Sequence, residues 1–329
     1  MTLLLLNEKE LRDAVRLDRP LIDAIEGGFA ALARGEVTMP PVMSIDVPDH
    51  EGQVDAKSAY IRGLPRFALK VAAGFPNNRA KGLPSGWGMI CVISAETGRG
   101  EALLLDNGYL TDIRTAAAGA VAARHLAIPS AATAGIVGAG VQARLQLEAL
   151  LLVRPITAAL VWARDVSQAH AFVAEMSTRL GISLEAVASL EQVVRESDIL
   201  VTTTAATHPL VERRWVRPGL HITAMGSDAE SKNELMPEIL GMAQRVVCDR
   251  RSQCERLGEL HHAIAKGVSL AEGSVVELGD VIVGKSPGRQ GLSDLTVCDL
   301  TGTGVQDSVI ANLAVERARE RGFGRLLEG

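Results

Sequence analysis

Apolar positions recur every three to four residues over residues 8–34, a spacing that places them on one face of a helix. Gly35 ends this run, so we expect one or two helices there. After Pro40 and Pro41 the period falls to about two, which predicts strands separated by Asp, Gly and Pro turns. The strands predicted in this part cover residues 42–47, 54–61, 67–71, 89–94 and 103–105.

A second pattern follows an alanine-rich stretch, residues 111–126, which predicts a closely packed helix that ends before Pro129. From residue 131 to about residue 299, short β-branched runs alternate with helical windows, as is typical of a parallel sheet covered by helices. The runs cover residues 134–137, 159–162, 199–203, 221–224 and 245–248. Residues 307–321 predict a long amphipathic helix that returns to pack on the first part of the chain.

Size and charge narrow the class of protein. The chain has 329 residues, more than the roughly 100 to 200 of a typical domain, so we expect two domains. Its net charge of −5 and its lack of a Lys/Arg run argue against general binding to nucleic acid or anionic membranes. Its apolar stretches are too short or too interrupted by charge to span a bilayer, and no signal-peptide pattern is present, so a cytoplasmic protein is expected.

The residues that often bind metals show no metal-binding spacing. The four cysteines are Cys91, Cys248, Cys254 and Cys298. Their spacing fits neither a zinc site nor a disulfide framework, so we expect free or buried thiols. His261 and His262 are adjacent and point to different sides of a helix, which makes them poor joint ligands. Glu259 and Glu277 are interpreted as surface or helix-capping carboxylates. We therefore predict no metal site.

A glycine-rich turn is the most specific motif in the chain. The run 134–137 leads directly into Gly138-Ala139-Gly140-Val141-Gln142-Ala143, and a helical pattern follows. Gly138 permits a tight turn, Gly140 allows the backbone to approach a pyrophosphate, and Ala143 allows close packing of helix and strand. With another predicted strand about 20 residues further on, the motif predicts a Rossmann-type doubly wound sheet that binds a nicotinamide dinucleotide.

The choice between NAD(H) and NADP(H) depends on the end of that next strand. Asp165 would hold the ribose 2′-hydroxyl of NAD(H), whereas Arg164 would accommodate the 2′-phosphate of NADP(H). Arg164 also suits stacking on adenine or a solvated surface position. The sequence leaves the choice open.

Three charged residues near predicted strand ends are candidates for the chemistry. Lys70 lies in an otherwise apolar strand, so it either needs a partner such as a substrate carboxylate or faces water at a sheet edge. Arg114 either grips a carboxylate or phosphate or pairs with Asp112. Asp228 either transfers a proton at an amine or imine nitrogen or caps the following helix.

Several longer motifs resemble the ornithine cyclodeaminase/mu-crystallin family across essentially the whole chain. They are Leu69-Lys70-Val71 with Gly74-Phe75-Pro76, Asp112-Ile113-Arg114-Thr115-Ala116-Ala117, the glycine-rich turn, and Ala224-Met225-Gly226-Ser227-Asp228 with Lys232 and Glu234. The resemblance implies a homodimer. It also implies a Rossmann domain over residues 126–304 and an α+β substrate-binding and dimerisation domain formed by residues 1–125 and 305–329.

The resemblance further implies which residues bind cofactor and substrate. Matching positions put cofactor contacts at Ser85, Arg114, Thr115, Gly138, Gly140, Val141, Gln142, Arg164, Thr204, Met225, Gly226, Ser227 and Lys232. Lys70, Arg114 and Asp228 fall on substrate positions, and the aspartate that matches Asp228 transfers a proton in the cyclodeaminase branch. Many members have a carboxylate-binding arginine where this chain has Met43 followed by Ser44, so Ser44 and Lys57 are expected to contribute to substrate binding instead.

The sequence of residues 104–112 and 299–307 resembles that of the ectoine-utilisation cyclodeaminase-like branch. This branch is similar to iminosuccinate reductases. We therefore hypothesise reduction of iminosuccinate to aspartate, with Lys70 and Asp228 as catalytic residues. Cyclisation of a diamino acid with release of ammonia is the alternative, for which Asp55 matches the acidic position that holds the distal amine. A second alternative is a mu-crystallin-like protein that binds NADPH and a small ligand without catalysis.

Overall fold

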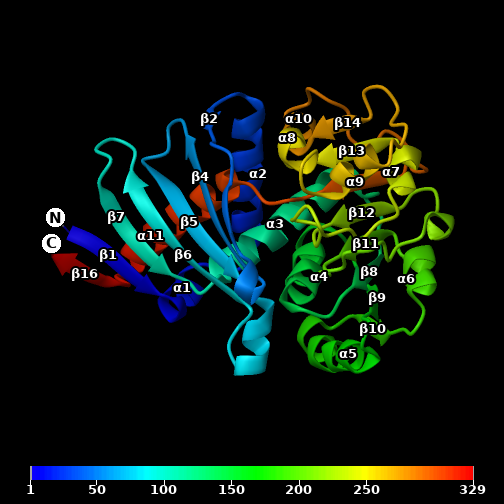
Figure 1. The fold of residues 1–329 in the computed structure, drawn as a ribbon, viewed down its shortest axis with the longest axis horizontal. Helices are drawn as coiled ribbons and strands as arrows, with labels where there is room; N and C mark the ends of the chain where they lie inside the picture. Colours follow the sequence, from blue (N-terminus) through cyan, green and yellow to red (C-terminus); the bar gives the residue numbers. More distant parts are fainter. Residues whose placement is uncertain (1, 329) are drawn as a thin grey trace. The chain divides into compact units, whose positions relative to one another are not determined.

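The computed structural model describes residues 2–328, apart from the side chain of Arg79, and divides the chain into two compact units. Unit 1 comprises Met1–Thr115 and Thr303–Gly329, and unit 2 comprises Ala116–Gly302. The first crossing between the units lies within helix α3 (Tyr109–Leu126), so unit 2 is an insertion into unit 1 (Figure 1).

Unit 1 is built on an eight-stranded mixed sheet with the order β16-β1-β7-β6-β5-β4-β2, in which β3 also pairs with β4. The strands are β1 (Thr2–Asn7), β2 (Val37–Thr38), β3 (Met43–Val47), β4 (Gly52–Ile61), β5 (Arg66–Gly74), β6 (Gly86–Ser94), β7 (Gly100–Leu105) and β16 (Arg325–Glu328). Two short 3-10 helices, η1 (Pro48–His50) and η2 (Pro76–Lys81), follow β3 and β5. The five strands predicted from the alternating pattern are present, whereas β1, β2 and β16 were not predicted.

Helices α1 (Glu8–Ala14), α2 (Arg19–Ala33) and α11 (Gly304–Arg321) pack in unit 1, where α11 lies against β4, β5 and α2 (Figure 1). Ser308 ties α11 to the sheet, because its hydroxyl accepts the Ala68 N–H at 3.0 Å and donates to the Ala59 carbonyl at 2.5 Å. A Cβ at Gly304 would lie 2.4 Å from the Ser58 carbonyl oxygen, so only glycine allows this close approach. The first half of α11 is buried almost all round, which the amphipathic prediction did not anticipate.

The other face of the unit 1 sheet is apolar and much more exposed. Along β1 the helix-facing residues Leu4 and Leu6 are buried, whereas Leu3 and Leu5 on the opposite face are half-buried. Some large side chains on this open face are strongly exposed, namely Met43, Ile45, Leu69 and Trp87. We call this surface the open sheet face.

Unit 2 contains a second eight-stranded sheet, wholly parallel, with the order β10-β9-β8-β11-β12-β15-β13-β14. Its strands are β8 (Thr133–Val137), β9 (Ala158–Trp162), β10 (Ser183–Ala186), β11 (Ile199–Thr202), β12 (His221–Ala224), β13 (Arg245–Cys248), β14 (Val275–Glu277) and β15 (Thr296–Asp299). Strand order reverses between β8 and β11, as in a doubly wound Rossmann-type sheet. The predicted α/β class with a Rossmann-type sheet is confirmed, although β10, β14 and β15 were not predicted.

The helices of unit 2 connect these strands. They are α4 (Val141–Val153), α5 (Val166–Leu180), α6 (Leu190–Glu196), α7 (Glu238–Met242), α8 (Arg251–Cys254), α9 (Glu259–Ala265) and α10 (Leu278–Ile282), with a 3-10 turn η3 (Arg213–Trp215). Every residue of β11, β12 and β15 is buried, as expected for central parallel strands covered on both faces. Across residues 2–328, no helix combines the length and the apolar character needed to cross a membrane.

Candidate functional site

Three cations surround one carboxylate in unit 1. Lys57 on β4 and Lys70 on β5 are cross-strand partners, so their side chains project from the same face of the sheet. Lys70 Nζ lies 3.0 Å from one oxygen of Asp307, in the first turn of α11, and 3.1 Å from the other. Arg114 on α3 donates from Nε to Asp307 at 3.1 Å and from Nη1 to Gln306 Oε1 at 2.7 Å. We call Lys57, Lys70, Arg114 and Asp307 the cation cluster.

The cation cluster holds more positive than negative charge in a buried place. Burial and the nearby Arg114 lower the pKa of Lys70 to about 7, although Asp307 opposes this shift. Burial raises the pKa of Asp307, but Lys70 and Arg114 outweigh that effect and leave it below its usual value. Lys70 and Arg114 share the carboxylate of Asp307, and Lys57 is the cross-strand neighbour of Lys70, an arrangement that favours binding of an anion. The water-facing alternative for Lys70 is wrong, because its side chain is buried against Asp307, and Arg114 is buried against the same carboxylate.

Polar residues continue this face of β4 beyond Lys57. Asp55 is two residues before Lys57 and pairs with Ser44 on β3, whose hydroxyl donates to Asp55 Oδ1 at 2.6 Å. Met43 pairs instead with Ala56, so its side chain lies on the opposite face of the sheet. Lys57 therefore occupies a different place from that of an arginine at position 43.

In unit 2 the glycine-rich turn has a geometry that suits a dinucleotide. Gly138 has φ +116°, and a Cβ there would lie 2.6 Å from Thr203 Oγ1, so a side chain is excluded. A Cβ at Gly140 would meet nothing within 4 Å, which leaves space beside the N-terminus of α4. Gly140 caps α4 without a side-chain hydrogen bond, and Ala143 is fully buried. The backbone N–H groups of this turn therefore fit a pyrophosphate.

Most of the other predicted cofactor residues lie at the carboxyl ends of the unit 2 strands. Val141 and Gln142 open α4, Arg164 follows β9, Thr204 follows β11, and Met225, Gly226, Ser227 and Lys232 follow β12. This edge is where doubly wound sheets bind ligands. Ser85, Arg114 and Thr115 belong instead to unit 1.

The two residues that bear on cofactor choice differ in what they contact. The Asp165 side chain caps α5 and accepts the Ser167 N–H at 2.9 Å and the Ser167 hydroxyl at 2.6 Å. These hydrogen bonds from Ser167 lower the pKa of Asp165. Arg164 is exposed. Asp165 thus stabilises the N-terminus of α5.

Asp228 lies in the loop that follows β12, and its side chain is about half exposed. Its Oδ1 forms an ion pair at 2.5 Å with Nζ of Lys232, four residues later. The helix-capping alternative for Asp228 is wrong, because the next helix, α7, has Pro237 at its N-cap. The Asp228 carboxyl group is therefore a partly exposed member of an ion pair and not a helix cap.

Buried carboxylates that the sequence analysis did not identify as site residues hold the ends of the unit 2 strands together. Glu234 accepts hydrogen bonds from the hydroxyl of Thr202 at 2.6 Å, the N–H and hydroxyl of Thr204 at 2.5 and 2.7 Å, and the N–H of Gly226 at 2.9 Å. Glu234 thus joins the loops after β11 and β12. Glu259 is fully buried, so its interpretation as a surface or capping carboxylate is wrong. Burial is the largest cause that raises the pKa of Glu259 to about 8, and the nearby Asp299 is the second.

The structure also brings together cysteines that are separated in sequence. Cys248, Cys254 and Asp299 are buried, and one ligand atom of each lies within 4.8 Å of the others. Cys254 Sγ lies 3.4 Å from Asp249 Oδ1 and 3.4 Å from the Asp299 carbonyl oxygen, which places the thiol in a hydrogen-bonded core. The four cysteines are free thiols, as predicted.

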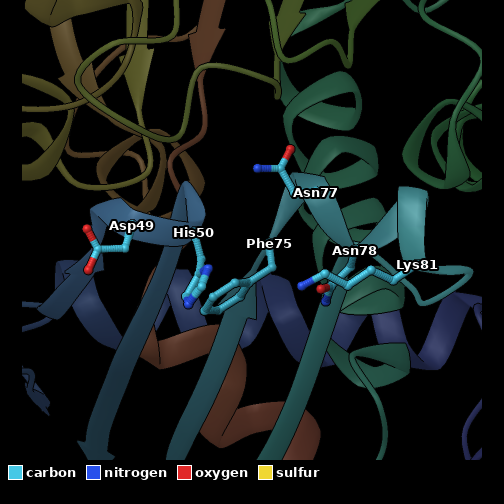
Figure 2. A pocket seen from close by; sticks show the side chains of 6 residues that line it. All are labelled: Asp49, His50, Phe75, Asn77, Asn78 and Lys81. Atoms are coloured by element: carbon cyan, nitrogen blue, oxygen red, sulfur yellow. The ribbon is translucent and has the colours of Figure 1, made fainter.

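A cavity of about 510 Å³ opens where β5 ends. Its lining residues are Asp49, His50, Phe75, Asn77, Asn78 and Lys81 (Figure 2). The rings of His50 and Phe75 lie beside each other in Figure 2, and a Cβ at Gly52 would lie 2.1 Å from the Phe75 ring. Among these described lining residues, none belongs to the cation cluster.

Fold and site together define a two-unit protein in which a Rossmann-type unit is inserted into an α+β unit that contains a cluster of cations around a buried carboxylate. The chain belongs to the ornithine cyclodeaminase/mu-crystallin family, whose model matches residues 2–322. It is 51% identical to an uncharacterised cyclodeaminase of Sinorhizobium fredii, over 99% of both chains.

Two solved structures share the whole fold. An archaeal alanine dehydrogenase dimer with bound NAD superposes with a TM-score of 0.94 at 33% identity, covering 100% of this chain and 99% of the other. The iminosuccinate reductase of Paracoccus denitrificans in complex with NAD⁺ superposes with a TM-score of 0.92 at 32% identity, covering 100% of both chains.

Proposed function

We propose that this protein is an NAD(H)-dependent imine reductase that acts on a small dicarboxylic imino acid, with iminosuccinate as substrate and L-aspartate as product. The observation that carries this proposal is the cation cluster, in which Lys70 and Arg114 share the carboxylate of Asp307 and Lys57 is the cross-strand neighbour of Lys70. A substrate with two carboxylates offers one anion to Lys70 and Arg114 and a second to Lys57, whereas a monocarboxylic imine offers an anion to only one of these places. The similarity to an iminosuccinate reductase over the whole chain supports the same substrate class.

The carboxylates of the substrate would bind to side chains of unit 1. Arg114 presents a planar fork suited to one carboxylate, and Lys70 and Lys57 present point charges beside it. Ser44 adds a hydroxyl on the same face of the sheet. Asp307 holds Lys70 and Arg114 in place, so that substrate carboxylates meet cations that are already ordered.

NAD(H) would bind to unit 2 at the glycine-rich turn, with Thr204, Gly226 and Lys232 at the neighbouring strand ends. Bound NADH supplies the hydride that reduces the imine carbon. The imine nitrogen must gain a proton as its C=N bond becomes a C–N bond. In our assignment the protonated form of Asp228 donates that proton and is left as the carboxylate, which pairs with Lys232 as seen in the structure.

We also propose that the protein is a homodimer that buries the open sheet face. Met43 is 60% exposed, Ile45 53% and Trp87 45%, which is unusual for large apolar side chains that share one sheet surface. A second copy of the same face would cover them. The archaeal alanine dehydrogenase with the same fold is a dimer.

Cyclodeamination of a diamino acid is the second candidate, because Asp55 lies two residues from Lys57 on the same face of β4 and could bind a distal amine. The Sinorhizobium fredii relative of this chain is named an uncharacterised cyclodeaminase. Against this reaction, Lys57 places a cation beside the amine that Asp55 would hold.

One assay separates the two reactions. Purified protein is incubated with NADH and with iminosuccinate generated in place from oxaloacetate and ammonia, while loss of NADH absorbance and formation of aspartate are followed. A parallel reaction without ammonia measures reduction of oxaloacetate itself. Aspartate equal to the NADH consumed would support the reductase. Ammonia released from a diamino acid, with catalytic NAD⁺ and no net change in NADH, would support the cyclodeaminase instead.

A further inference from the structure

The loop between β12 and α7 carries Asp228 and several predicted cofactor residues. Hydrogen bonds between residues of this loop fix its conformation. At the first end the Gly226 N–H donates to Glu234 Oε2 at 2.9 Å. Ser227, almost fully buried, then donates from its hydroxyl to the Lys232 carbonyl oxygen at 2.5 Å, which closes residues 227–232 into a small ring. Asp228 lies inside this ring, so the ring's geometry sets where its carboxyl group points.

One face of α9 holds the same loop from outside. Glu259 and His262 are three residues apart and therefore project from the same side of the helix. Glu259 accepts the backbone N–H of Glu234 at 2.8 Å and that of Leu235 at 3.2 Å. It also accepts the side-chain amide of Asn233 at 2.6 Å. All of these contacts lie within unit 2.

His262 reaches the ring that contains Asp228. Its Nε2 lies 2.8 Å from the Lys232 carbonyl oxygen, and because a carbonyl only accepts, Nε2 carries the proton. The Lys232 carbonyl thus accepts from His262 and from Ser227, which satisfies both of its lone pairs. The Nδ1 of the neighbouring His261 lies instead 3.3 Å from the Glu255 carbonyl oxygen, and its ring packs edge-on against that of His262 with centroids 5.1 Å apart.

We propose that His262 and Glu259 are positioning residues that fix the loop carrying Asp228, and that His262 acts through its hydrogen bond to the Lys232 carbonyl. The proposal deepens the proposed function and rests on it, because Asp228 is the proton donor there. His262 is the better residue to test. Glu259 is fully buried with three partners, so changing it would disturb folding as well as position.

The test uses a donor-removing variant, a donor-keeping variant and an adjacent control. His262→Leu keeps most of the side-chain volume but cannot donate, whereas His262→Gln retains an N–H at a similar reach. His261→Leu makes the same change one residue away. A net hydrogen bond is worth about 0.5–1.5 kcal/mol, so kcat for imine reduction by His262→Leu should fall about two- to tenfold. The kcat of His262→Gln should be close to that of the unaltered protein, and His261→Leu should leave kcat unchanged.

A double variant separates positioning from general stability. In an Asp228→Asn background the loop no longer carries the acid, so His262→Leu should cause no further fall in kcat. A fall of the same size in both backgrounds would overturn the proposal, as would equal rates for His262→Leu and His261→Leu. Thermal melting of each variant identifies any that has lost its fold, and His262→Gln then decides by itself whether the donor matters.

NADH binding keeps this test separate from the proposed function. If the unaltered protein reduces no imine, the proposed function fails, but NADH affinity can still be measured by fluorescence titration. The loop also carries Ser227 and Lys232 from the predicted cofactor site, so His262→Leu should weaken NADH binding about two- to tenfold relative to His261→Leu. Equal affinities in the two leucine variants would then reject the positioning role.

Discussion

Single residues set the charge of the unit 1 site. Lys57 and Lys70 are direct cross-strand partners, an arrangement that repels unless anions lie nearby. Asp307 is the buried anion that pairs with both Lys70 and Arg114 and so stabilises the arrangement. In the proposed function this arrangement binds an anionic ligand, and Lys57 is the residue assigned to the second carboxylate.

Replacing Lys57 by methionine should therefore change selectivity rather than abolish activity. Loss of one charge-assisted hydrogen bond is worth roughly 1.5–3 kcal/mol, so kcat/KM for iminosuccinate should fall about ten- to a hundredfold. Reduction of the monocarboxylic imine formed from pyruvate and ammonia should change much less. The control is Lys81→Met, which changes an exposed lysine that lines the cavity at the end of β5. An equal loss for both imines would contradict the assignment of Lys57.

Lys70 should impose a pH limit on the reaction. Burial lowers its pKa to about 7, so in the free protein its charged form is present below that pH and is lost as pH rises. Because the charged form binds the substrate carboxylate, kcat/KM should decline above about pH 7. Lys70→Arg, which stays charged, should move this decline to higher pH. A flat pH profile up to pH 9 would show that Lys70 does not bind substrate.

At the scale of elements, the unit 2 site depends on close contact between the loop that follows β11 and the loop that follows β12. Strands β11 and β12 are parallel neighbours, and Glu234 accepts hydrogen bonds from the residues that follow both. The approach is so close that a Cβ at Gly226 would lie 2.1 Å from the Thr204 carbonyl oxygen and 2.6 Å from the Glu234 carboxyl carbon. Position 226 therefore requires glycine for lack of space.

Gly226→Ala should weaken both stability and cofactor binding. Overpacking a tight site costs roughly 1–3 kcal/mol, which urea denaturation would detect, and NADH titration should show weaker binding. Gly27→Ala in α2 is the matched control, because a Cβ there meets nothing within 4 Å. The control should gain about 0.5–1 kcal/mol from the better helix propensity of alanine. Equal stability of the two variants would mean that the loops can move apart.

At the scale of the whole molecule, the open sheet face argues for a second copy of the chain. Leu69→Glu places a charge in the middle of this face, at a side chain that is 39% exposed in the single chain. A charge buried in an apolar interface is strongly unfavourable, so sedimentation should show a shift from dimer to monomer. Ile264→Glu, at a 50% exposed apolar side chain of unit 2, should leave the assembly unchanged. A Leu69→Glu variant that sediments as the unaltered protein does would reject this face as the interface.

How far the sequence predicted the fold depended on local signals. Strands β4 to β7 have flanking turns and alternating or β-branched residues, so they were predicted, whereas β1 is a run of leucines and half of β15 is Cys298 and Asp299, which are not typical strand residues. Lys70 and Arg114 were found because charged residues stand out among apolar and alanine-rich neighbours. Their partner Asp307 lies 237 residues from Lys70 along the chain, and no local pattern connects them. Glu234 and Glu259 were missed as site residues because they act on backbone groups, which a sequence does not display.

The insertion of unit 2 into unit 1 sets an order for folding during synthesis. All of unit 2 has been made once the ribosome has passed Gly302, so the parallel sheet can form while the chain is still growing. At that moment Lys70 and Arg114 have no Asp307, and β1 has no β16 beside it. The residues that follow unit 2 thus complete the unit that precedes it, and the cation cluster can be assembled only after all of unit 2 has been made.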